Sequence, residues 1–128
     1  MDVHDSLWQS ALVTAEDLAA RLSVIHCVHE ARGLDVWEGV REKLERCGDG
    51  ESVAVLETNI KEEVGHVAKG VKWLQWLCER DGRDASEEFS KHVEQHFRGK
   101  IKPPFNYVLR DEAKMPRAWY SHYDKTDA

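Results

Sequence analysis

Glu63 and His66, near the middle of the chain, have the types and spacing of metal ligands on a helix. Side chains three positions apart share one helix face, so a carboxylate and an imidazole can reach one point. Glu63 also interrupts a helical stripe of apolar residues: Val53, Leu56, Ile60, Val67, Val71, Leu74 and Cys78. Burying a carboxylate costs free energy unless a cation or metal ion compensates its charge. We therefore expect Glu63 to have a partner.

Long helices are expected to position this pair, because apolar residues recur every three or four positions. Thr14 is predicted to cap a helix that reaches about Arg46, with a kink or bulge at residues 32–35, where Gly33 weakens it. Cys47-Gly-Asp-Gly50 is predicted to be a tight turn. A second long helix should follow, from about Glu51 to Arg80.

Shorter elements are expected on both sides of this hairpin. Residues 1–13 are interpreted as a lead-in, and 14–81 as the long hairpin. Within residues 82–128, Asp84 is expected to cap a helix at 85–98. An extended segment should follow at 99–110, and then a last short helix at 116–123. No strand pattern is convincing. The fold prediction is a single all-α domain over residues 1–128.

Glu30 is the partner that hairpin arithmetic suggests for Glu63. Glu30 lies about 18 residues before the middle of the turn and Glu63 about 15 after it, so at 1.5 Å per residue they are level to within roughly 5 Å. Glu30 is also on the inner side of its helix, beside His26 and His29. Two carboxylates and an imidazole at one level suit iron, manganese or zinc.

Several alternatives to metal binding at this site stay open. Glu63 or Glu30 could form an ion pair with Arg32. His26 and His29 are satisfied histidines at the core edge, additional ligands of the metal, or residues that contact its ligands. Glu62 could replace Glu63 as a ligand, although it faces away from the apolar stripe.

Two further groups have spacings that could carry chemistry. His92 and His96, four positions apart, could clamp a surface ion but have no evident third ligand. Arg110 and Asp111 are interpreted only as loop residues that form ion pairs.

Three strings of the chain resemble a known family. They are His29-Glu-Ala-Arg-Gly-Leu-Asp-Val36, Glu62-Glu-Val-Gly-His-Val67 and Pro104-Phe-Asn106. Together they resemble the C-terminal half of an uncharacterised bacterial-type family within the ferritin-like superfamily, from about Leu7 to Tyr123. The resemblance implies a ferritin-like helical bundle in which Glu30 is the lone helix carboxylate and Glu63 and His66 are the paired ligands.

The same resemblance implies an incomplete site. Such proteins carry another Glu and another Glu-x-x-His on two earlier helices, and the sequence before the first predicted long helix does not supply them. One chain would thus form half of a four-helix bundle and half of a di-metal site. We expect a homodimer that joins two hairpins through their apolar faces and completes the site; a truncated piece of a longer protein is the alternative.

Composition excludes some classes of function. The 128 residues are 41% hydrophobic and 33% charged with a net charge of −6, which makes a nucleic-acid partner unexpected. No apolar run is long enough to span a membrane, and the N-terminus lacks a signal-peptide pattern. Cys27, Cys47 and Cys78 have no metal-finger spacing and are expected to be free thiols in a cytoplasmic protein.

Two functional hypotheses follow. The first is a ferritin-like metal-binding protein, with iron favoured over manganese or zinc, that acts as an oxidoreductase or handles oxygen. The second is a metal-free helical module that dimerises or docks through its apolar face and retains vestigial ligands. No residue identifies a substrate, and fold resemblance alone does not establish a reaction.

Overall fold

The computed structural model describes the backbone of residues 2–124 and the side chains of residues 7–124. Helices, turns and one extended segment make up this part of the chain, which contains no strand. The predicted all-α class is therefore confirmed for the described residues, whereas residue 1 and the end of the predicted tail at 125–128 lie outside them. The elements in chain order are α1 (Asp2–Val13), α2 (Leu18–Arg21), η1 (Leu22–Glu30), α3 (Ala31–Arg46), α4 (Gly50–Arg80), α5 (Ala85–His96), α6 (Tyr107–Glu112), η2 (Arg117–Trp119) and η3 (Ser121–Tyr123).

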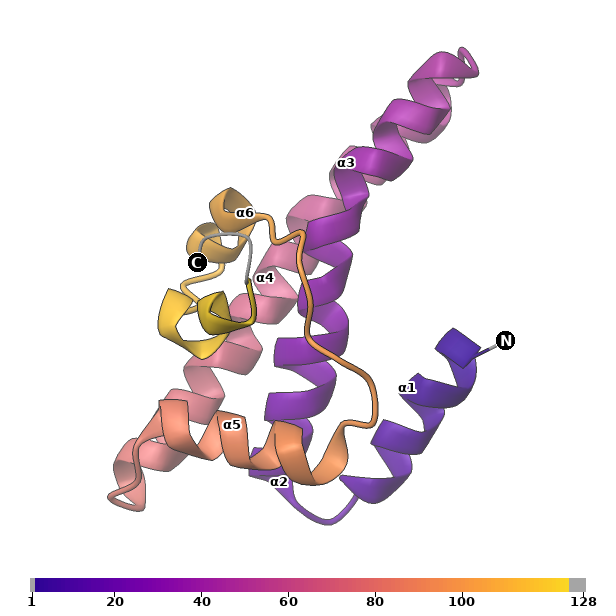
Figure 1. Cartoon of the computed structure of the whole chain (residues 1–128). Helices are drawn as coiled ribbons and strands as arrows, with labels where there is room; N and C mark the ends of the chain where they lie inside the picture. Colours follow the sequence, from indigo (N-terminus) through magenta and orange to yellow (C-terminus); the bar gives the residue numbers. More distant parts are fainter. Residues whose placement is uncertain (1, 125–128) are drawn as a thin grey trace.

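A long helical hairpin is the centre of the fold (Figure 1). One continuous helical run, α2–η1–α3, leads into a turn, and α4 returns beside η1 and α3. Gly48 has a φ of 73°, which permits the tight turn. The Asp49 side chain then accepts a hydrogen bond from the Ser52 amide and caps α4. The predicted turn and both ends of the second long helix are confirmed to within one residue.

Burial is uneven along the hairpin. Val67, Val71, Leu74 and Cys78 of α4 are buried, together with Leu22, Val28 and Leu34 of the opposite run. The end near the turn projects beyond the other elements in Figure 1, and there Val40 and Val55 are exposed. The apolar stripe of α4 is therefore core only in its second half.

The first long helix differs from its prediction in two ways. Thr14 does not cap it: the Thr14 hydroxyl donates to the Ser10 carbonyl, and Asp17 caps α2 by accepting from the Ala20 amide. The expected kink at residues 32–35 is also wrong. The irregular part is η1, a π-helix at residues 22–30, and α3 continues regularly through Gly33. A glycine lowers helix propensity, but packing decides where the helix deforms.

Gly70 of α4 shows why the π-helix η1 lies so close to α4. A Cβ atom at Gly70 would come within 2.5 Å of the His26 Cβ, so η1 and α4 approach more closely there than ordinary side chains allow. A Cβ atom at Gly33 would approach only the Glu63 Cγ, at 4.0 Å. The constraint on backbone spacing therefore lies at His26 and Gly70, one helical turn from Glu30.

The C-terminal third wraps around the hairpin. Asp84 caps α5 as predicted, by accepting from the Glu87 amide, although this helix ends at His96 rather than at residue 98. The extended segment ends earlier than expected, because the Asn106 side chain caps α6 by accepting from the Leu109 amide. Instead of a last helix at 116–123 there are two short 3₁₀ turns, η2 and η3. Figure 1 shows α5 crossing the base of the hairpin.

Helix α4 is long, but it is not apolar enough to span a membrane. It contains 31 residues, with charged side chains throughout. Across the described chain, no helix combines the length and the apolar character needed to cross a bilayer.

Candidate metal centre

Glu30, Glu63 and His66 come together between the two arms of the hairpin. Each offers one ligand atom, and these three atoms all lie within 4.8 Å of one another. The His66 Nδ1 is 3.7 Å from a Glu63 carboxylate oxygen and 3.9 Å from one of Glu30. The prediction that the Glu30 and Glu63 carboxylates lie at the same height along the hairpin is thus confirmed. The prediction that Glu63 and His66 share one face of α4 is confirmed as well.

The backbone of η1 helps to place Glu30. Glu30 is the last residue of the π-helix, and the His26 Nδ1 forms a short hydrogen bond with its carboxylate. This contact leaves the second carboxylate oxygen, Oε2, facing His66. The contact satisfies the His26 imidazole and orients the Glu30 carboxylate, so it is compatible with both interpretations of His26. π-Helical turns occur often at functional sites, which is consistent with this placement.

The electrostatics of Glu63 reflect its neighbours. Partial burial raises the pKa of its carboxyl above the ordinary value, and a hydrogen bond and like charge from Glu30 raise that pKa further. His66 acts in the opposite direction and lowers it. Burial and the neighbouring carboxylate of Glu30 thus both disfavour the charged form of Glu63. A metal ion would neutralise the same pair more fully.

The site is open on one side. The side chains of Glu30 and Glu63 are only 24% and 28% exposed, while that of His66 is 55% exposed. A groove beside the site is lined by Leu22, His26, Glu30, His66, Lys69, Gly70 and Trp73. Further ligands could therefore approach from the groove.

The other residues that the sequence suggested as members of this site lie outside it in the structure. Arg32 does not pair with Glu30 or Glu63; it donates instead to the backbone carbonyls of Lys102 and Pro104. Glu62 is exposed and does not belong to the cluster. His29 also points elsewhere, with its Nε2 2.9 Å from the Ser10 hydroxyl, and burial lowers its pKa.

His92 and His96 do not form the surface clamp that their spacing permitted. His92 is buried, its Nε2 lies 3.1 Å from a Glu88 carboxylate oxygen, and its ring stacks on that of His96. The four-residue spacing of Glu88 and His92 was the available signal for this pair, and sequence reasoning missed it. The three cysteines are free; Cys27 and Cys78 are buried, and Cys47 is exposed at the end of α3.

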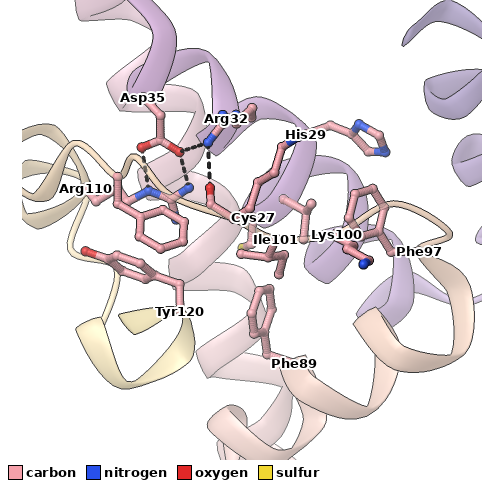
Figure 2. A pocket seen from close by; sticks show the side chains of 13 residues that line it. Cys27, His29, Arg32, Asp35, Phe89, Phe97, Lys100, Ile101, Arg110 and Tyr120 are labelled. Atoms are coloured by element: carbon pink, nitrogen blue, oxygen red, sulfur yellow. Dashed lines mark hydrogen bonds and ion pairs between the residues drawn. The ribbon is translucent and has the colours of Figure 1, made fainter. Parts of the chain in front are cut away.

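Asp35 and Arg110 are the most important residues that sequence reasoning missed. Arg110 was expected to form a loop ion pair, but it is buried and donates two hydrogen bonds to Asp35, at 2.9 and 2.7 Å, as the dashed lines in Figure 2 show. Asp111 pairs separately with Arg117 on the surface. The Asn106 amide also donates to Asp35, so the strings around residues 29–36 and 104–106 meet in space.

Comparison with known proteins gives a family but no function. An uncharacterized protein of Haemophilus influenzae is 33% identical over 121 residues, which is 94% of this chain and 41% of that protein. The chain therefore spans less than half the length of this relative. No solved structure gave a significant match. The family described as "Protein of unknown function (DUF455)" matches residues 1–121. The chain belongs to the DUF455 family.

Proposed function

We propose that Glu30, Glu63 and His66 bind a transition-metal ion, with iron favoured over manganese or zinc. The observation that carries this proposal is the convergence of two carboxylates and one imidazole, from two helices, with ligand atoms within 4.8 Å of one another. Oxygen and imidazole donors together suit these metals. A single ion of ordinary coordination radius could contact all three groups after small side-chain rotations.

The electrostatics of the pair support a cation rather than a purely structural cluster. Glu30 and Glu63 face each other while both are more than two-thirds shielded from solvent. Among the described residues, no Arg or Lys forms an ion pair with either carboxylate. Arg32 donates instead to the Lys102 carbonyl. In the part of the chain that the structure describes, only His26 and His66 pair with these carboxylates, and they carry positive charge only when protonated. A divalent ion would remove this imbalance.

The resemblance of the strings to ferritin-like proteins supports iron or manganese and a bundle architecture. When bound in such a ligand set, iron or manganese supplies reactivity toward oxygen or peroxide. The residues of this chain would hold the ion, and His26 would orient Glu30. The proposal stops at metal binding, with oxygen-handling oxidoreductase activity as the hypothesis that it makes worth testing.

A second copy of the chain is proposed to complete the site. One chain offers three ligands, and the groove beside them is open. The groove is lined by the apolar side chains of Leu22 and Trp73, and Trp73 is 53% exposed in the single chain. A two-fold dimer through this face would bury these residues and bring two Glu30–Glu63–His66 sets together.

The test is elemental analysis of the purified protein combined with its mass in solution. We expect about one or two transition ions per assembled site. Glu63→Gln should abolish metal binding, whereas Glu62→Gln, the same change on the exposed neighbouring residue, should retain it. Equal metal content in both variants would show that the site is assigned wrongly.

The second candidate function is a metal-free interaction module. The exposed aromatic pair Trp73 and Trp76, with ring centroids 5.7 Å apart, favours docking through the same face. Under this candidate the protein assembles fully without metal. Glu63→Gln would then leave the assembled mass unchanged and add stability, because it removes a half-buried charge.

A further inference from the structure

A small cavity lies between η1, α5 and the extended segment 97–106, and it is separate from the metal centre. Its volume is about 110 Å³, and it shares no lining residue with the groove beside Glu30. Cys27, Phe89, Ile101 and Tyr120 are among the residues that line it (Figure 2). Cavities of this size can hold a compact apolar group if the wall is apolar.

The rim of this cavity is positively charged, although the chain as a whole is acidic. Arg32, Lys100, Lys102 and Arg110 line it, against the single carboxylate of Asp35. Arg110 neutralises Asp35 through two hydrogen bonds, with both side chains buried. The lining residues therefore carry an excess of positive charge, four cations against one carboxylate, in a chain whose net charge is −6. This local reversal of sign favours an anion at the rim.

Arg32 is held in place for such a role. Its Nη1 donates to the Lys102 and Pro104 carbonyls, at 2.8 and 3.1 Å. The contact with Asp35, at 3.5 Å, also uses Nη1. Its Nε and Nη2 donate to none of the described residues, so two N–H directions of a fixed guanidinium are open. A guanidinium with adjacent open donors matches the two oxygens of a carboxylate.

We propose that this cavity binds a small organic anion that carries one carboxylate on a compact apolar body, of about the size of benzoate. The carboxylate would lie at Arg32 and Lys100, and the apolar body would contact Cys27 and Phe89. An inorganic anion would leave the apolar wall uncovered, and a neutral molecule would not use the cationic rim. The combination of wall and rim selects the class of ligand.

The test is titration of the full chain, labelled with ¹⁵N, with benzoate, benzamide and inorganic phosphate. Benzoate should shift the amide resonances of Cys27, Phe89 and Ile101. Benzamide, which has the same shape without the charge, should bind about tenfold more weakly or worse, as expected for the loss of a charge-assisted hydrogen bond. Phosphate should also bind more weakly. Equal binding of benzamide or phosphate, or no shift up to the solubility limit of benzoate, would overturn the proposal.

Three variants locate the binding site. Arg32→Gln should weaken benzoate binding about tenfold. Because this change also removes the contacts with residues 102 and 104, Lys100→Glu provides a second variant: Lys100 is exposed and its side chain makes no described bond, so folding should be unaffected while binding weakens. Lys72→Gln, on the exposed face of α4, is the matched control for charge and should bind like wild type. If Lys72→Gln weakens binding as much as Arg32→Gln, the effect is general electrostatics and the cavity is not the site.

Discussion

Asp35 on α3 and Arg110 on α6 form a fully buried, doubly hydrogen-bonded ion pair across 75 residues of sequence. The Asp35 side chain is 0% exposed and that of Arg110 is 4% exposed. The Arg110 guanidinium also lies over the Tyr120 ring, 4.4 Å from its centroid. This pair therefore fastens the C-terminal third of the chain to the hairpin, and it closes one side of the cavity in Figure 2.

Arg110→Met should destabilise the fold by about 3–5 kcal/mol, because it leaves the Asp35 carboxylate buried without its main partner. The measurement is the free energy of unfolding from a urea titration. Arg117→Met is the matched control, since it breaks the exposed pair with Asp111 by the same change of side chain, and it should leave stability close to that of wild type. Similar losses in both variants would contradict the importance given to the buried pair.

Gly70→Ala should force η1 and α4 apart and cost roughly 1–3 kcal/mol, because the added methyl group would overlap the Cβ of His26. Gly65→Ala on the same helix meets no atom within 4 Å and should instead gain roughly 0.5–1 kcal/mol from helix propensity. Unfolding titrations of the two variants give the comparison. A stabilised Gly70→Ala would show that the close approach is not a constraint.

The helix ends and the hairpin could be predicted from sequence because local chemistry decides them. Gly48 supplies the left-handed turn conformation, and Asp49 and Asp84 supply the caps. The level of Glu30 and Glu63 followed from a tight turn and a constant helical rise. These features depend on residues close in sequence or on a single well-defined turn.

Other features depended on packing between distant segments and were missed. The π-helix lies where η1 meets Gly70 of α4, and no residue within η1 predicts it from the sequence. Arg32 could have paired with Glu63 in a bare hairpin, but the extended segment offers it two backbone carbonyls. Asn106 and Thr14 are both competent caps in isolation, and only their surroundings show that Asn106 acts as one and Thr14 does not.

His29 should make stability depend on pH. Its ordinary pKa is 6.5 and burial lowers that value in the folded chain. Between the two pKa values the unfolded chain binds more protons, so stability falls as the pH falls through 6.5 toward the folded pKa. His29→Gln should remove this part of the pH dependence of the urea midpoint. His122→Gln, at an exposed histidine, should keep it. An unchanged slope in His29→Gln would contradict the prediction.

Glu63→Gln should separate the two roles of the carboxylate cluster in a thermal melt. Without metal, the variant should melt higher than wild type, because burial and Glu30 both disfavour the charged form of Glu63. With added Mn²⁺ or Zn²⁺, the wild-type melting temperature should rise with ion concentration, as binding to the folded state requires. The variant should not respond, whereas Glu62→Gln should behave like wild type. A metal response retained by Glu63→Gln would count against Glu63 as a ligand.

Trp73 connects the metal centre with assembly, because it lines the same groove as Glu30 and His66 and is 53% exposed. If a second copy covers this groove, Trp73→Ser should weaken the dimer roughly thirtyfold, as expected when an aromatic anchor worth about 2 kcal/mol is truncated. Light scattering over a dilution series measures this change, and metal content should fall in parallel. Val55→Ser, at an apolar residue near the hairpin turn that is 61% exposed, should leave both unchanged. A wild-type protein that stays monomeric with metal bound would reject the dimer while keeping the site, since the open groove would then hold water or smaller ligands.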